Sequence, residues 1–299
     1  QRIAVDKLHI VGDIYDRGPS PHIIMDELLK FPNVDFQWGN HDIAWMGACS
    51  GNTALIAACV ADAIKYNNFD MLEDGYGINL RKLFEFAMAT YGDDPCTCFA
   101  PRIYDDNIFD NITIEAASKM YKAISIIRFK LDYALIERNP DMKMEERNAL
   151  KYIDFETMTY KGAKLKDTNF PTIDPKDPSK LTKEEKNVIH ILKQDFIKND
   201  KLNKHMDFLY KNGAMYKVEN GSLLFHGCIP LTKEGDFQEV ELDGVVYKGK
   251  SLMDYFEKIA RNAYYTNDQK AKDMMWYLIS GRFSPIFGKS QYSYFENIF

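Results

Sequence analysis

The first forty residues alternate short apolar runs with one amphipathic stretch. Residues 8–11 and 34–38 are mostly apolar, and residues 21–31 between them place apolar side chains at helical spacing. Short apolar runs bounded by turn residues predict buried strands, and the spacing between them predicts a helix. A strand, helix, strand unit places its two strands side by side and parallel in one sheet. We therefore expect an α/β fold.

The middle of the chain has a different pattern. Apolar side chains recur at helical intervals over long stretches, as in residues 56–64 and 114–131. Prolines between residues 169 and 180 predict a loop, and Thr182 with Glu185 predicts a capping box that begins the next helix. We expect residues 52–212 to be mostly helical.

Strand patterns return after residue 213. The pairs Asn220-Gly221 and Asp243-Gly244 each separate two strand-like runs, and both pairs tolerate the positive φ angles of a tight hairpin. Two amphipathic stretches, 252–264 and 269–278, then predict helices before an aromatic-rich end. The runs that flank the two turns are residues 215–219 and 222–226, and residues 237–242 and 245–248.

Length and composition are those of a globular protein. With 299 residues and 45% hydrophobic content, the chain can bury a large core and form one large domain or two ordinary ones. We expect residues 1–51 and 213–299 to form a core and residues 52–212 to form a helical insertion. The five cysteines are odd in number and have no CxxC spacing, so neither a disulfide framework nor a structural zinc site is predicted.

Charge and hydropathy narrow the possible partners. A net charge of −6 argues against broad binding to nucleic acid or to an anionic membrane, because no basic field would offset phosphate repulsion. No run approaches the ~20 apolar residues of a membrane span, and no signal peptide is recognisable, so we expect a cytoplasmic protein. The sequence predicts no oligomeric state.

Two polar motifs follow the first two predicted strands. Asp13, Asp16 and Arg17 lie in residues 12–18 (GDIYDRG), and Asn40 and His41 lie in residues 39–42 (GNHD). Because the carboxyl ends of parallel strands meet at one edge of a sheet, the motifs should lie together. Carboxylate and amide oxygens suit divalent ions, a guanidinium suits phosphate, and a histidine can pass a proton to a leaving oxygen. Either motif alone could be an ordinary turn or helix cap, but the pair favours a metal-assisted phosphatase.

A third motif, His226-Gly227, ends a later predicted strand and repeats the pattern of strand, polar ligand and glycine. Taken alone, such a histidine is more often structural, but beside an Asp and Asn site it is well placed to bind metal. We interpret the remaining four histidines as structural or solvated. These are His9, His22, His190 and His205.

The three motifs, in this order, resemble the metallophosphoesterases, and especially their phosphoprotein-phosphatase-like branch. Longer segments narrow the resemblance to class III fructose-1,6-bisphosphatase, and together they cover essentially the whole chain. These segments are residues 40–52, 72–80, 165–178, 226–231 and the closing run 284–289 (SPIFGK).

The resemblance implies a metallophosphoesterase β-sandwich flanked by helices, with two divalent ions, Mn²⁺ or similar, in the full-length protein. It implies that Asp13 bridges the ions, that Asn40 and His226 ligate the second, and that His41 is the general acid, oriented by Asp16. Arg17, together with Asn40 and His41, would hold the phosphate. The implied reaction is hydrolysis of the 1-phosphate of fructose 1,6-bisphosphate, a small sugar bisphosphate, in gluconeogenesis.

Two pieces of the family pattern do not occur in this sequence. No Asp-x-His precedes Asp13, and no histidine follows His226, so the first ion keeps only Asp13 of its ligands. The chain begins at Gln1 and stops at Phe299 after an aromatic-rich run. We therefore expect a piece of a longer protein that is inactive by itself.

Two alternatives remain open. The first is a protein phosphatase or a dinucleoside-polyphosphate hydrolase of the same fold, against which the long helical insertion argues. The second is a non-enzymatic module or a catalytically incomplete fragment. The presence of Asp13, Asn40 and His41 argues against loss of activity in the parent protein.

Overall fold

The structure is a computed structural model that describes residues 6–103, 112–289, 294–295 and 298–299. The fold is mixed α/β, as predicted. By the contacts between residues, the chain forms two compact units. The first unit comprises Gln1–Leu55 and Ile197–Gln291, and the second comprises Ile56–Phe196 and Tyr292–Phe299.

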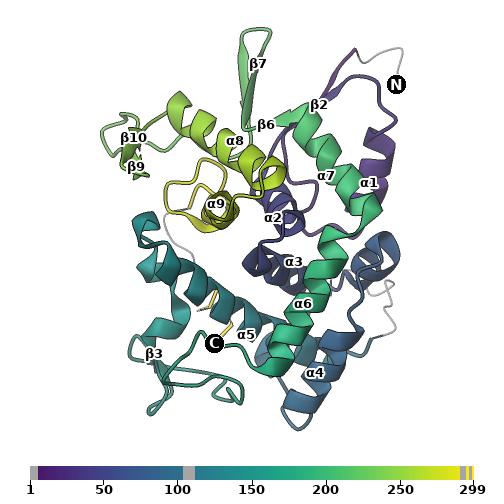
Figure 1. Ribbon diagram of the computed structural model, residues 1–299, viewed down its shortest axis with the longest axis vertical. Coiled ribbons are helices and arrows are strands. Elements are labelled where there is room, and N and C mark those ends of the chain that lie inside the picture. Colours follow the sequence, from purple (N-terminus) through teal and green to yellow (C-terminus); the bar gives the residue numbers. More distant parts are fainter. Residues whose placement is uncertain (1–5, 104–111, 290–293, 296–297) are drawn as a thin grey trace. The chain divides into compact units, whose positions relative to one another are not determined.

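The first unit is built on a three-stranded parallel sheet (Figure 1). Leu8 lies opposite Val34, and helix α1 (Pro21–Leu28) connects the two strands, which confirms the predicted strand, helix, strand unit. The third strand joins the far side of the second strand, where Phe36 lies opposite Gly213. In the order β1-β2-β6, the strands are β1 (Leu8–Ile10), β2 (Val34–Gln37) and β6 (Gly213–Ala214).

Helix α2 (Asn40–Cys49) follows β2 directly and is the best-buried helix of this unit. Every residue from Asp42 to Cys49 is buried, so the helix is apolar on all sides apart from its first turn. It packs against the three later helices, of which the first also covers β2 and β6. These helices are α7 (Asp200–Asn212), α8 (Lys250–Tyr265) and α9 (Gln269–Ser280).

Both predicted hairpins are present in the first unit. Asn220 and Gly221 have φ angles of 50° and 76°, and Asp243 and Gly244 have φ angles of 54° and 73°, as the tight turns require. The second hairpin is shorter than predicted, because Phe237 forms an isolated bridge with Leu231. The strands are β7 (Tyr216–Glu219) and β8 (Ser222–Phe225), followed by β9 (Val240–Leu242) and β10 (Val245–Tyr247).

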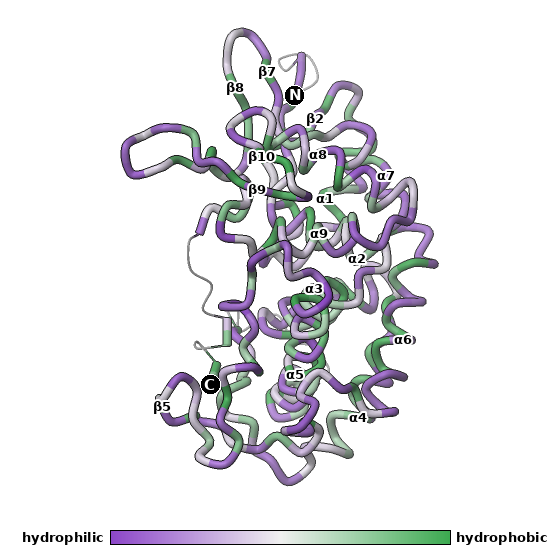
Figure 2. The backbone as a smooth tube through the Cα atoms, turned by 60° about the vertical axis from the view of Figure 1, so that its left-hand side comes forward, coloured by the Kyte–Doolittle hydropathy of each residue, from purple (hydrophilic) through white to green (hydrophobic). Residues whose placement is uncertain are grey.

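The second unit is mainly helical, as predicted for this part of the chain. Helix α5 (Ile114–Arg138) lies at its centre, and the buried lysines on this helix all have partners, such as Lys130 with Glu185. Helix α6 (Lys183–Ile197) is amphipathic, and its hydrophilic and hydrophobic bands alternate in Figure 2. The unit also contains the α-helices α3 (Thr53–Lys65), which begins in the first unit, and α4 (Arg81–Tyr91). Its short 3-10 and π turns are Met71–Gly75, Thr97–Phe99, Pro140–Met142, Glu145–Arg147 and Ala149–Tyr152.

The capping box predicted at Thr182 and Glu185 is present in the second unit. The Thr182 N–H donates to Glu185 Oε2 at 2.7 Å, and the Glu185 N–H donates to Thr182 Oγ1 at 3.1 Å. These two reciprocal hydrogen bonds form the predicted capping box. A small antiparallel sheet between α5 and α6 was not predicted. Its strands, β3 (Ile153–Asp154), β4 (Thr159–Tyr160) and β5 (Ala163–Lys164), are two residues each.

None of the five cysteines, all within the described segments, takes part in a disulfide. Among the described residues, no helix has the length and apolar character needed to cross a bilayer.

Candidate active site

Two glycines bring the first two motifs into backbone contact. Gly12 and Asp13 both have positive φ angles, 80° and 59°, so the chain turns sharply after β1. A Cβ atom on Gly39 would lie 2.2 Å from Asp13 Oδ1, and one on Gly12 would lie 2.6 Å from the Gly39 nitrogen. Glycine is therefore required at both positions by the close approach of the two loops.

Asp42 ties the same loops together. Its buried carboxylate accepts hydrogen bonds from the N–H groups of Asp13 at 2.8 Å, Gly39 at 2.9 Å and Tyr15 at 3.3 Å. Burial raises the pKa of Asp42 to about 6, although the Gly39 N–H acts in the opposite direction. Asp42 was not among the predicted site residues. Its position in the first turn of a helix that follows a glycine was the available signal.

His226 meets Asp13 at the carboxyl end of β1. Its Nε2 lies 3.2 Å from Asp13 Oδ2, and its Nδ1 lies 2.8 Å from the Val11 carbonyl oxygen. Since a carbonyl can only accept, Nδ1 carries the proton and Nε2 is the atom presented to Asp13 or to a metal. The hydrogen bond with Asp13 raises the pKa of His226 to about 9.

Asp13 is ionised at neutral pH. Burial would raise its pKa, but the hydrogen bond with His226 and the charge of His41 outweigh this and lower the pKa below 3.8. The other carboxylate oxygen, Oδ1, accepts the backbone N–H of His41 at 3.1 Å. One carboxylate thus connects all three sequence motifs.

His41 and Asp16 form a second pair beside Asp13. His41 Nε2 lies 2.9 Å from Asp16 Oδ1, and the Arg17 Nε lies 3.4 Å from the same oxygen. The hydrogen bond with His41 lowers the pKa of Asp16, so a carboxylate faces the imidazole. The Arg17 side chain is 57% exposed, which leaves its guanidinium accessible to a solute.

The donor atoms suit a divalent cation. The ligand atoms of Asp13, Asp16 and His41 lie within 4.8 Å of one another, and His226 adds an imidazole nitrogen beside Asp13. Carboxylate oxygens and imidazole nitrogens are ligands of divalent first-row metals. Of the predicted ligands, Asp13 and His226 meet directly, and Asn40 is the first residue of α2, between Gly39 and His41.

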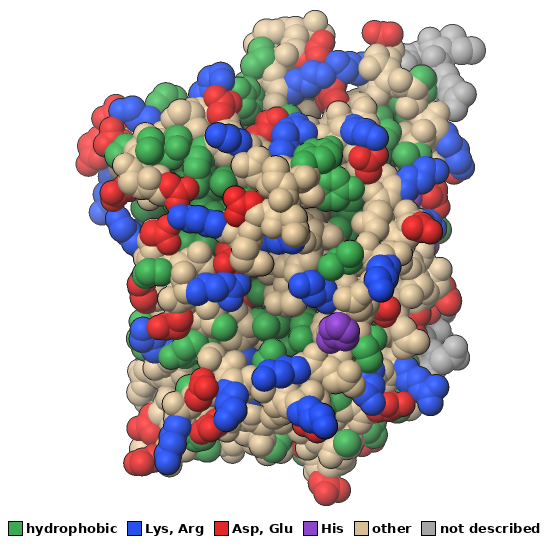
Figure 3. Space-filling model, in the orientation of Figure 1, with side chains coloured by type: hydrophobic (Ala, Val, Ile, Leu, Met, Phe, Trp, Pro, Cys, Tyr) green, Lys and Arg blue, Asp and Glu red, His purple; other side chains and the backbone are tan. Residues whose placement is uncertain are grey.

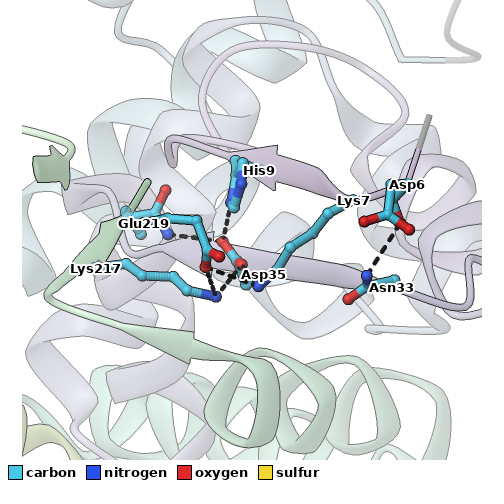
Figure 4. Close-up of polar contacts among 8 residues, drawn as sticks. Asp6, Lys7, His9, Asn33, Asp35, Lys217 and Glu219 are labelled. Atoms are coloured by element: carbon cyan, nitrogen blue, oxygen red, sulfur yellow. Dashed lines mark hydrogen bonds and ion pairs between the residues drawn. The ribbon is translucent and has the colours of Figure 1, made fainter. Parts of the chain in front are cut away.

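A second group with metal-like spacing joins strands β1 and β2 to β7. His9, Asp35 and Glu219 cluster there, but Figure 4 shows Lys7 and Lys217 reaching Asp35 from opposite sides. His9 Nδ1 lies 2.8 Å from Asp35 Oδ1, and Lys217 Nζ lies 2.5 Å from Asp35 Oδ2. Two ammonium groups already balance the carboxylates, so we assign this cluster a structural role.

His205 has a comparable structural contact. It is fully buried, and its Nε2 lies 3.0 Å from Asp26 Oδ1, which connects α7 to α1. This agrees with the interpretation of His9 and His205 as structural residues.

Comparison with known families identifies the chain. The family described as Firmicute fructose-1,6-bisphosphatase matches residues 1–299. The chain belongs to this family. Curated class 3 fructose-1,6-bisphosphatases from Clostridium tetani, Clostridium novyi and Bacteroides fragilis are 49%, 48% and 47% identical to it over its whole length.

The chain spans 46% of the length of each of these three relatives. No solved structure matches it. The family assignment agrees with the resemblance based on the three motifs, which the structure brings together around Asp13.

Proposed function

We propose that this chain carries the catalytic site of a fructose-1,6-bisphosphatase, which hydrolyses fructose 1,6-bisphosphate to fructose 6-phosphate and phosphate. The observation that carries the proposal is the convergence of His41 and His226 on the two oxygens of Asp13. The substrate is proposed from the relatives that share the whole chain, whose name is fructose-1,6-bisphosphatase class 3.

We also propose the architecture that belongs to this activity. Residues 1–51 and 213–299 would form part of a metallophosphoesterase β-sandwich, and residues 52–212 would be a helical insertion. The parallel pairing of β1 and β2, with a site motif after each strand, supports this arrangement.

Asp13, Asn40 and His226 would hold the metal, which we propose to be Mn²⁺, with two ions in the longer protein. When bound, such ions supply the Lewis acidity that activates a water molecule and stabilises charge on the phosphate oxygens. The chain's own backbone groups would orient the ligand side chains before a metal binds. The Val11 carbonyl fixes the His226 tautomer, and the N–H of His41 orients the Asp13 carboxylate.

His41 and Asp16 would provide acid catalysis. The ionised Asp16 carboxylate stabilises a protonated His41 imidazole, which can donate its proton to the departing sugar oxygen. The helix start that carries Asn40 and His41 also places backbone dipoles at the site, which favour a bound anion.

Arg17 would bind the phosphate, since its planar fork can contact two phosphate oxygens at once. Acidic and basic side chains are interspersed over the face shown in Figure 3. With a net charge of −6, attraction of a small anionic substrate would depend on local groups such as Arg17.

The test is phosphate release with added Mn²⁺ from this chain joined to the flanking segments of the Clostridium tetani relative. Release from fructose 1,6-bisphosphate should require Mn²⁺ and disappear in Asp13→Asn, whereas Asp207→Asn, at a partly exposed carboxylate of α7, should be unchanged. A phosphoserine peptide and a dinucleoside polyphosphate serve as competing substrates. Preference for either of them, or activity that survives Asp13→Asn, would contradict the proposal.

A further inference from the structure

The run 284–289 (SPIFGK), one of the segments that carry the family resemblance, forms a turn a few residues after the end of α9 at Ser280. Ser284 is fully buried, and its Oγ donates to the Leu278 carbonyl oxygen at 2.5 Å. The same Oγ accepts the N–H groups of Ile286 and Phe287, each at 3.3 Å. One hydroxyl thus uses its donor and both lone pairs to close this turn onto the end of α9.

The turn touches the backbone that follows His226. The Cys228 N–H donates to the Pro285 carbonyl oxygen at 2.7 Å. At Gly227, a Cβ atom would lie 2.4 Å from that oxygen and 2.6 Å from the Ile286 Cα. The two backbones therefore pack in direct contact, and only glycine at position 227 permits the approach.

This contact matters because strand pairing alone does not connect His226 to the sheet. Among the described residues, β8 pairs only with β7, and this hairpin is separate from the sheet formed by β1, β2 and β6. A two-stranded hairpin is marginally stable by itself. The contacts of His226 with Val11 and Asp13 therefore depend on how the end of β8 is held.

The turn and the start of α2 share one support. Leu278, which receives the Ser284 hydrogen bond, is buried in α9, and α9 packs against α2. The first turn of α2 carries Asn40 and His41. Helix α9 thus supports α2 directly and supports His226 through Ser284 and Pro285.

We propose that Ser284 is a positioning residue for the metal site: by shaping the 284–288 turn, it fixes residues 227–228 and thereby the place of the His226 imidazole. Ser284 touches no proposed ligand and acts through the backbone of Pro285 and Cys228. The inference rests on the proposed function for its consequence, because His226 matters to activity only as a metal ligand.

The experiment compares Ser284→Ala with Ser280→Ala in the 299-residue chain. Ser280, the last residue of α9, is as buried as Ser284, and its Oγ donates to the Trp276 carbonyl oxygen within the helix, so this control loses a buried hydroxyl without altering the turn. In metal-free protein, hydrogen exchange at the Cys228 amide and the NMR signals of the His226 ring, assigned with His226→Gln, report directly on positioning. Thermal unfolding of both variants reports on general stability.

Ser284→Ala should speed exchange at Cys228 about tenfold and shift the His226 ring signals, whereas Ser280→Ala should leave both unchanged at a similar loss of stability. Titration with Co²⁺, followed by absorbance, should show about tenfold weaker binding in Ser284→Ala alone, within the range expected for groups that orient metal ligands. His226 signals and Cys228 exchange that match the wild type in Ser284→Ala would overturn the inference. A wild-type chain that binds no Co²⁺ would count against the proposed function, while the metal-free measurements would still decide the role of Ser284.

Discussion

Two histidines of the proposed site have different surroundings, and the proposed function gives them different roles. His226 is held by the Val11 carbonyl, so that Nε2 points at Asp13, as expected of a ligand. His41 uses its Nε2 for Asp16, as expected of a proton donor with a stabilising carboxylate. Replacing each histidine by asparagine should therefore affect different properties of the protein.

In this chain joined to the flanking segments of the Clostridium tetani relative, we expect His41→Asn to lower turnover by roughly 10²–10⁴-fold, the usual contribution of a general acid. Its metal content should be nearly unchanged. His226→Asn should lower metal content as well as turnover. Metal analysis of the two purified variants beside steady-state kinetics separates the roles. Equal loss of metal in both would mean that His41 is a ligand.

Arg17→Lys should impair substrate binding more than metal binding, because a lysine ammonium cannot reproduce a bidentate contact with phosphate. We expect a several-fold increase in KM for fructose 1,6-bisphosphate, consistent with the loss of about 1–2 kcal/mol from one charged hydrogen bond. Arg282→Lys, at another exposed position in the first unit, is the matched control. Identical kinetics in the two variants would remove Arg17 from the site.

At the scale of elements, several structures follow from local signals. The strand, helix, strand unit and both hairpins are predictable because short-range patterns and turn residues determine them, as with Asn220 and Gly221. The pairing of β2 with β6 is not predictable in this way, because it joins residues far apart in the chain. The same limit applies within the site: Asp13 and His41 could be placed together, but the contacts of Asp42 and Ser284 depend on the tertiary fold.

One buried glutamate connects helices α5 and α6. Glu185 closes the capping box at Thr182 and also pairs with Lys130, and both charged side chains are essentially fully buried. Burial lowers the pKa of Lys130, while Glu185 acts to raise it. The pair therefore links the start of one helix to the middle of another.

Glu185→Gln should destabilise the second unit by about 3–5 kcal/mol, because Lys130 would be left as a buried charge without its counter-ion. Glu184→Gln, at the exposed neighbouring position in the same helix turn, should change stability by less than about 0.5 kcal/mol. Urea unfolding followed by circular dichroism measures both. A loss below about 1 kcal/mol for Glu185→Gln would indicate that Lys130 finds another partner or becomes neutral.

At the scale of the whole molecule, the stability of the first unit can be followed by itself. All three tryptophans, Trp38, Trp45 and Trp276, lie in this unit. The charged cluster around Asp35 lies there too and joins β1 and β2 to the β7 hairpin (Figure 4). Tryptophan fluorescence therefore measures the contribution of this cluster.

Asp35→Asn should lower the free energy of unfolding of the first unit by about 2 kcal/mol at pH 7, with a difference that shrinks as the pH falls below about 4. Burial would raise the pKa of Asp35, but hydrogen bonds from Lys217, His9 and Gln37 lower it below 3.8. A depressed pKa means that the carboxylate stabilises the fold above its ordinary pKa and that this stabilisation is lost in acid. Asp254→Asn, at an exposed ion pair with Lys250, is the control. A difference that does not depend on pH would show that the carboxylate charge is unimportant.

The burial of α2 on all sides has a consequence for synthesis on the ribosome. The helices that cover it, α7, α8 and α9, are all made more than 150 residues later. At roughly 5–20 residues per second, about 8–30 seconds pass between synthesis of the apolar α2 segment and synthesis of its first covering helix. We expect chaperones to bind a nascent chain in which α2 is not yet covered. A chain that stops before Asp200 should aggregate, because it lacks all three covering helices.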